Sequence, residues 1–168
     1  MTFADSVRTC LFEKYATFSG RASRSEYWWF FLAAMIVGFA MMGIGYLLVG
    51  MAAIDPNVGE GTFLIFPISG NTAWDVVNGA VTLAILIPSI AVGYRRMQDR
   101  NVHGMWYVLL MIPVYLGSMF PLSAQIALGV VTIIASLFVL VMFVMRGTVG
   151  PNKYGPDPLG AGDEEIFT

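Results

Sequence analysis

The sequence predicts an all-α integral membrane protein, a four-helix bundle preceded by a short amphipathic helix. Of its 168 residues, 57% are hydrophobic and 12% are charged, whereas soluble domains carry about 45–50% apolar and about 25% charged residues. The hydrophobic residues also form uncharged stretches long enough to cross a bilayer core, which takes about 20 helical residues. This composition excludes a water-soluble globule and an intrinsically disordered chain, and a single cysteine cannot supply a disulfide framework.

Four transmembrane helices account for the uncharged stretches. We expect spans near residues 27–53, 74–94, 105–120 and 124–145. Thr72 and Asp75 mark the start of the second span with the spacing of a capping box. The last two spans divide one uncharged run from Met105 to Met145, which is twice too long for one helix and contains Pro121. Helices are expected because backbone groups left unpaired in lipid are costly.

All nine basic residues fall on one side of this four-span arrangement. They are Arg8, Lys14, Arg21, Arg24, Arg95, Arg96, Arg100, Arg146 and Lys153. The two connections on the other side, 55–75 and 117–123, contain no Lys or Arg. Because basic residues are retained inside the cell, this asymmetry predicts that the N-terminus and the C-terminus are both cytoplasmic.

The two ends of the chain differ from the spans in character. Apolar residues recur at helical intervals near the start, which predicts a short amphipathic helix on the inner membrane surface. These residues are Phe3, Val7, Leu11, Tyr15 and Phe18. Three acidic residues and a long following apolar stretch argue against a signal peptide. We expect residues 1–158 to form a single membrane domain and residues 159–168 to form a flexible acidic tail.

Polar residues that could form a site lie in three segments at the predicted cytoplasmic end, 18–30, 95–106 and 146–158. Folding of the bundle brings the first two segments together, so that an arginine of each can pair with a carboxylate of the other. The candidate interaction or anion-binding cluster consists of Arg21, Arg24, Glu26, Arg95, Arg96 and Asp99.

This cluster has two interpretations. In the first, its arginines fix the topology and its ion pairs hold the loops together. In the second, Arg21, Arg24, Arg95 and Arg96 bind the phosphate of a lipid headgroup, because guanidinium groups match phosphate geometry and basic cytoplasmic pockets attract acidic lipids.

No enzyme class is indicated by the sequence. His103 is the only histidine, Cys10 is the only cysteine, and neither has a partner at metal-ligand spacing. The glycines near residue 150 match no nucleotide-binding fingerprint. Charged residues are missing from the predicted spans apart from Asp75 at the outer edge of the second one, which disfavours a proton-coupled transporter. We therefore expect neither catalysis nor a metal or cofactor.

Three motifs occur in a characteristic order: F-S-G-R-A-S-R-S-E-Y-W-W-F over 18–30, I-P-S-I-A-V-G-Y-R-R-M-Q-D over 87–99, and G-T-V-G-P-N-K-Y-G-P-D-P over 147–158. This combination resembles the YhaH/YhaI-type family of small bacterial inner-membrane proteins, a family of unknown function with four predicted spans. The resemblance covers about residues 12–158 and implies a location and an architecture rather than a reaction. Gln98 departs from the family's usual motif, which has histidine at this position.

Two functions remain as hypotheses. The favoured one is a non-catalytic interaction or lipid-binding module that acts through the cytoplasmic cluster. Its expected partners are membrane lipids, including anionic headgroups, and a membrane protein or a second copy of the chain. No nucleic-acid partner is expected. The alternative is a small-solute transporter or channel subunit that works as a homo-oligomer, since four short spans leave little room for a pathway within one chain.

Overall fold

The computed structural model describes residues 1–49, 62–63, 66–67, 71–116 and 122–160. The regular elements among these residues are helices and one short hairpin, which agrees with the predicted all-helical class. The elements are α1 (Phe3–Arg8), the π-helical turn η1 (Thr9–Glu13), α2 (Arg24–Val49), β1 (Thr62–Phe63), β2 (Phe66–Pro67), α3 (Thr72–Asp99), α4 (Met105–Leu116) and α5 (Leu122–Val144).

Two of these helices have the length and composition to cross a membrane, Arg24–Leu48 with 25 residues and Thr72–Asp99 with 28. In α5, the apolar stretch Leu128–Val144 is shorter, and α4 is described over 12 residues. The ends of the first and third predicted spans, 50–53 and 117–120, lie outside the described residues. The same holds for most of the predicted connection 55–75 and for the tail residues 161–168.

The helix α3 differs from its predicted bounds at both ends. Its N-cap is Asn71, whose side chain accepts a hydrogen bond from the Trp74 backbone N–H at 3.1 Å, so the cap lies one residue before the predicted Thr72. At the other end, the helix continues past Tyr94 as far as Asp99. This extension is decisive for the site, because it places Arg95, Arg96 and Asp99 on a regular helix.

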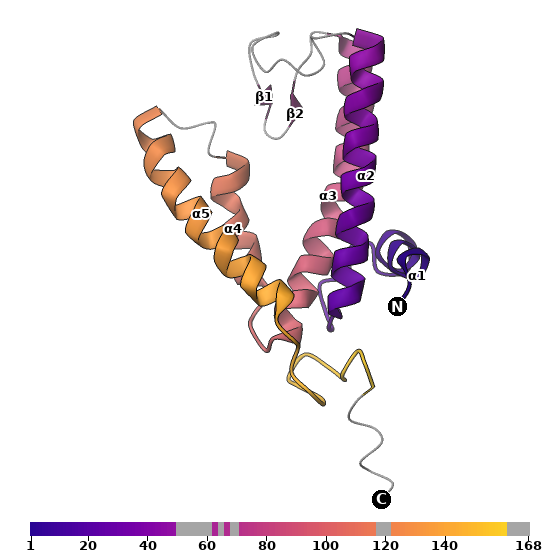
Figure 1. Cartoon of the computed structure of the whole chain (residues 1–168), viewed down its shortest axis with the longest axis vertical. Helices are drawn as coiled ribbons and strands as arrows, with labels where there is room; N and C mark the ends of the chain where they lie inside the picture. Colours follow the sequence, from indigo (N-terminus) through magenta and orange to yellow (C-terminus); the bar gives the residue numbers. More distant parts are fainter. Residues whose placement is uncertain (50–61, 64–65, 68–70, 117–121, 161–168) are drawn as a thin grey trace, which may run out of the picture.

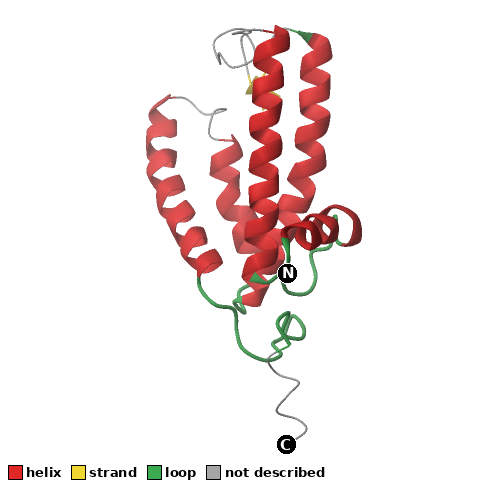
Figure 2. Ribbon diagram, turned by 45° about the vertical axis from the view of Figure 1, so that its right-hand side comes forward, coloured by secondary structure: helices red, strands yellow, loops and turns green. Residues whose placement is uncertain are grey.

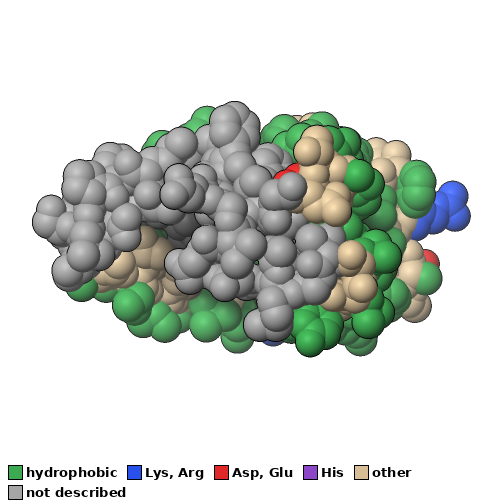
Figure 3. Space-filling view, turned by 90° about the horizontal axis from the view of Figure 1, so that it is seen from above, with side chains coloured by type: hydrophobic (Ala, Val, Ile, Leu, Met, Phe, Trp, Pro, Cys, Tyr) green, Lys and Arg blue, Asp and Glu red, His purple; other side chains and the backbone are tan. Residues whose placement is uncertain are grey.

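The long helices are arranged as two pairs (Figures 1 and 2). Helix α2 packs along α3, and α4 packs along α5. The pairs meet where α2 begins and α3 ends, which we call the basic end, and they diverge toward the opposite end. Helix α1 packs against α2 near the basic end. Seen from the opposite end, the flanks of the described surface are mostly hydrophobic (Figure 3). A closed membrane-spanning four-helix bundle stays a prediction.

Aromatic rings close the junction between the two pairs. The ring of Phe143 in α5 lies 4.3 Å, centroid to centroid, from that of Tyr27 in α2 and 5.4 Å from that of Tyr107 in α4. Tyr107 packs so tightly on Gly93 of α3 that a Cβ there would lie 2.4 Å from the ring. The pairs are therefore held together next to the residues that form the candidate site.

Candidate functional site

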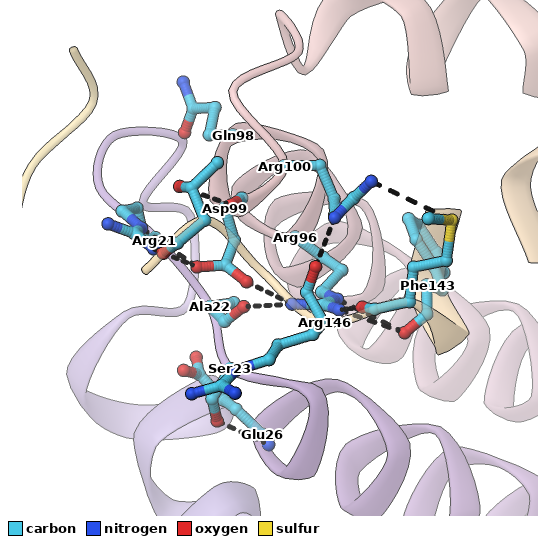
Figure 4. A network of polar contacts seen from close by, with 12 residues as sticks. Arg21, Ala22, Ser23, Glu26, Arg96, Gln98, Asp99, Arg100, Phe143 and Arg146 are labelled. Carbon is cyan, nitrogen blue, oxygen red and sulfur yellow. Dashed lines mark hydrogen bonds and ion pairs between the residues drawn. The ribbon is translucent and has the colours of Figure 1, made fainter. Parts of the chain in front are cut away.

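The structure brings five of the six predicted cluster residues together at the basic end (Figure 4). They are Arg21, Glu26, Arg95, Arg96 and Asp99, which we call the buried ion-pair cluster, and Figure 4 labels all of them except Arg95. Each of these residues is no more than 6% exposed. The sixth residue, Arg24, is the first residue of α2 and is exposed to solvent. Burial therefore separates Arg24 from the other arginines that the sequence grouped with it.

The last two turns of α3 supply most of the cluster. Asp99 follows Arg96 by three residues, and neighbours at this spacing on a helix can form an ion pair, which they do. Arg95 points to a different side of the helix and pairs with Glu26 in the first turn of α2. The two adjacent arginines therefore connect α3 to different parts of the molecule.

Asp99 is the centre of the cluster. One of its carboxylate oxygens, Oδ1, accepts a hydrogen bond from Arg21 Nε at 2.9 Å and lies 2.8 Å from Arg21 Nη2. The other oxygen, Oδ2, accepts from Arg96 Nη1. A buried carboxylate needs such charge-assisted hydrogen bonds to offset the loss of water. Gly147 lets the chain pass close by, since a Cβ at that position would lie 1.9 Å from Oδ2.

The arginines also hold the segment after α5, residues 145–159, which we call the C-terminal strap. Arg21 donates from Nη1 to the Gly150 carbonyl at 2.6 Å and from Nη2 to the Thr148 carbonyl. Arg96 donates to the carbonyls of Phe143 and Met145. The last carbonyls of an α-helix accept no hydrogen bond from an N–H group of the same helix. Arg96 therefore donates to carbonyls that α5 leaves unpaired.

Polar residues outside the predicted cluster complete the attachment of the strap. The Asp99 carbonyl accepts from the Thr148 backbone N–H at 2.9 Å and from its hydroxyl at 3.1 Å. The amide nitrogen of Asn152 donates to the Gln98 carbonyl at 3.0 Å. Thr148 and Asn152 belong to the third motif, whose Gly and Pro content predicted a turn but not these contacts.

Gln98 has a structural role of its own. With its amide oriented so that the nitrogen faces the loop before α2, it donates to the carbonyls of Phe18 at 3.1 Å and Gly20 at 2.7 Å. Gln98 is 5% exposed. The position where the related motif has histidine thus holds a loop in this chain.

The buried cations and the carboxylates around them are balanced in number. Arg21, Arg95 and Arg96 face Glu26 and Asp99, and the Asp157 Oδ1 atom of the strap lies 3.9 Å from Arg21 Nη2. Two nitrogens of Arg95, Nε and Nη2, have no hydrogen-bond partner among the described residues, but Arg95 is only 1% exposed. The guanidinium groups of the cluster are therefore engaged within the chain or shielded from solvent.

The N-terminal segment covers the Glu26 side of the cluster. Ser6 donates from Oγ to the Glu26 carbonyl at 2.5 Å, and Cys10 is fully buried with Sγ 4.0 Å from Glu26 Oε1. Burial, together with the nearby Glu26 charge, raises the pKa of the Cys10 thiol to about 11. The small residues of this segment therefore face the protein. Phe12, which does not fit the predicted apolar stripe, is 80% exposed.

His103 lies at the turn between α3 and α4, where its Nδ1 accepts a hydrogen bond from the Met105 backbone N–H at 3.2 Å. Among the residues that the structure describes, no three His, Cys, Asp or Glu side chains gather closely enough to hold a metal ion.

Comparison with known proteins identifies relatives over most of the chain. The family described as "Protein of unknown function (DUF805)" matches residues 15–156. Inner membrane protein YhaI of Escherichia coli (strain K12) is 29% identical over 146 residues, which are 87% of this chain and 89% of the relative. Inner membrane protein YhaH of the same strain is 28% identical over 87% of this chain and 90% of the relative. No solved structure matches.

Proposed function

This chain belongs to the DUF805 family of proteins of unknown function, and on that premise we propose that it is a non-catalytic interaction module of the bacterial inner membrane. The names of YhaI and YhaH support the membrane location, and so do the two apolar helices. We further propose four spans with both termini in the cytoplasm, because this topology keeps all nine basic residues on one side. The basic end is then the cytoplasmic face.

The observation that carries the proposal is the buried ion-pair cluster, which connects three segments far apart in sequence. Arg21 precedes α2, Asp99 ends α3, and Thr148 follows α5, yet all three lie in one hydrogen-bonded network. Burying charges is costly, and its best-attested benefit is a unique geometry rather than greater stability. A preordered surface binds a partner with a smaller loss of conformational freedom. We infer that the cluster fixes the shape of a recognition surface.

The chemistry of the cluster supports binding over catalysis. A general acid or base must reach its substrate within hydrogen-bond distance, whereas Glu26 and Asp99 are buried and each is paired with arginine.

The groove between α4 and α5 is lined by Val102, Trp106, Leu110, Val131, Ile134, Ala135 and Phe138. Such an apolar lining suits lipid tails or a helix and offers no polar path to a solute.

The variant Asp99→Ala tests this function. It leaves Arg21 and Arg96 without their shared carboxylate, and removing one partner of a buried ion pair costs about 3–5 kcal/mol. We expect the strap to detach while the helices persist. Proteins and lipids that co-purify with the wild-type chain after gentle extraction should then be lost, with helical circular dichroism unchanged.

The matched control is Arg8→Ala, which removes an exposed cation from the same end without touching the cluster. Equal recovery of the same partners with wild-type, Asp99→Ala and Arg8→Ala chains would contradict the proposal. Saturable uptake of a small solute by liposomes that contain only this chain would support the transporter alternative in its place.

A further inference from the structure

Charge remains at the basic end after the buried pairs are formed. Arg24, Arg100 and Arg146 form no ion pair with any described residue, whereas the buried arginines face an equal number of carboxylates. Arg100 points back to the chain and donates to the Arg146 carbonyl. Arg24 and Arg146 are both exposed. Solvent can therefore reach the positive charge of these two side chains, as it can that of the exposed Lys153.

The two free arginines line the same depression. A small cavity of about 20 Å³ lies between the start of α2 and the strap, with Arg24 and Ser23 on one side and Arg146, Gly147 and Thr148 on the other. We call it the basic cup. A single water needs about 10–15 Å³ of such space, so the cup admits one oxygen-sized atom while the rest of a ligand stays at its rim.

The backbone adds to the positive potential of the cup. Helix α2 begins at Arg24 and runs for 26 residues, and the first N–H groups of a helix lack acceptors within it. The Ser23 hydroxyl accepts a hydrogen bond from one of them, the Glu26 N–H, at 3.1 Å. The N-terminus of a long helix favours an anion, and here it coincides with two unpaired guanidinium groups.

Two carboxylates also border the cup. Asp99 is paired with Arg21 and Arg96. Asp157 accepts backbone hydrogen bonds from Gly150 and Leu159, each at 3.0 Å, and lies 3.9 Å from Arg21 Nη2. The lining of the cup holds three arginines, Arg24, Arg96 and Arg146, against these two carboxylates, so a positive charge remains.

We propose that the basic cup binds a phosphate group, with Arg24 and Arg146 as its guanidinium ligands. Guanidinium groups match the geometry of phosphate oxygens better than any other side chain. This inference rests on the proposed function, since it identifies a ligand class for the same cytoplasmic surface. The phosphate comes from an anionic lipid headgroup or from a soluble phosphate, because both present the same oxygens.

The experiment compares the full-length chain in detergent with two double variants. The test variant is Arg24→Ala with Arg146→Ala, and the control is Arg8→Ala with Lys14→Ala, which removes two cations from the same end away from the cup. Each chain is titrated with phosphatidylglycerol, with phosphatidylcholine and with inorganic phosphate, and bound ligand is measured by native mass spectrometry. Thermal unfolding is measured in parallel, and no change is expected because both cup arginines are exposed and unpaired.

We expect the test variant to bind phosphatidylglycerol or phosphate about tenfold or more weakly than the wild type, and the control variant to bind as the wild type does. Retention of phosphatidylglycerol over phosphatidylcholine without competition from phosphate identifies a lipid headgroup. Binding of inorganic phosphate that displaces the lipid identifies a soluble ligand. Equal losses in both variants, or a wild type that binds neither probe, would overturn the proposal. If partner recovery still depends on Asp99 in that case, the proposed function stands and this inference alone fails.

Discussion

At the scale of residues, side chains near the basic end contact neighbouring glycines so closely that a larger residue would not fit at those positions. Asp99 is 2% exposed and is held by two arginines. Gly147 lies against its carboxylate, and Gly104 lies against the ring of Tyr94, where a Cβ would be 2.3 Å from the ring. These contacts explain why glycine occupies these two positions although neither needs an unusual backbone angle.

Gly147→Ala tests the closest of these approaches. The new methyl group would overlap Asp99 Oδ2, so either the strap or the buried carboxylate must move. We expect a loss of about 2 kcal/mol in unfolding free energy, in the usual range for overpacking. The control is Gly38→Ala in α2, where a Cβ meets nothing within 4 Å and the higher helix propensity of alanine applies. Thermal unfolding in detergent that ranks the two variants equally would contradict the described contact.

Cys10 provides a probe that needs no substitution, since it is the only cysteine. Its pKa of about 11 keeps the thiol protonated at neutral pH, and only the thiolate reacts. We expect maleimide to label the native chain far more slowly at pH 7.5 than it labels the chain unfolded in dodecyl sulfate. Labelling of the native chain at the rate of the unfolded one would show that the N-terminal segment does not cover Glu26.

At the scale of elements, the C-terminal strap has no regular structure of its own and depends on α3 for its position. The strap's carbonyls are bound by Arg21, Arg96 and Arg100, and a turn closes it where Asp157 accepts the backbone N–H groups of Gly150 and Leu159. The element is thus stabilised by polar contacts, and its stability should respond to charge and pH.

Asp157 makes this response testable. Its pKa is lowered below the ordinary value of 3.8, mainly by the hydrogen bond from the Leu159 backbone N–H and to a smaller extent by the one from the Gly150 backbone N–H. A carboxylate with a lowered folded-state pKa stabilises the fold fully above its unfolded value and loses that contribution as the pH falls through the folded value. We expect hydrogen-exchange protection of the strap to be constant from pH 7 to about 5 and to decrease below about pH 4.

The matched variant is Asp157→Asn, which cannot ionise. Its strap should be less protected than the wild-type strap at pH 7 and should change less on acidification. Identical protection of both straps at pH 7 would show that the Asp157 charge does not hold the turn.

The elements also show what the sequence could and could not predict. Uncharged length predicted helices at α2, α3, α4 and α5. Folding of these helices into a bundle brings segments 18–30 and 95–106 together, and this suggested ion pairs between their arginines and carboxylates. The burial of these residues was not predictable from the sequence. Arg95, Arg96 and Asp99 lie close together, and such a charged segment is typical of a solvated loop. Only the structure shows that α3 continues through it. The sequence also did not predict that Arg24, the first residue of α2, is exposed while the other arginines of the cluster are buried. Gln98 and Thr148 were missed because their contacts depend on backbone carbonyls, which no side-chain pattern reveals.

At the scale of the whole molecule, the two helix pairs share their main contacts at the basic end. Phe143, Tyr27 and Tyr107 pack there beside the buried ion-pair cluster, and away from it the pairs diverge (Figure 1). In our proposal this end lies at the cytoplasmic surface, so the part of the chain that holds the buried ion pairs is also the part that a cytoplasmic or headgroup partner meets.

The central claim is that the segments before α2, between α3 and α4, and after α5 share one cytoplasmic face. It is tested most directly by labelling single cysteines at exposed positions in a Cys10→Ala background: Arg24→Cys, Met105→Cys and Val149→Cys. A membrane-impermeant maleimide should label all three in inside-out vesicles and none of them in intact spheroplasts. Labelling of any of the three from the outside would contradict the account.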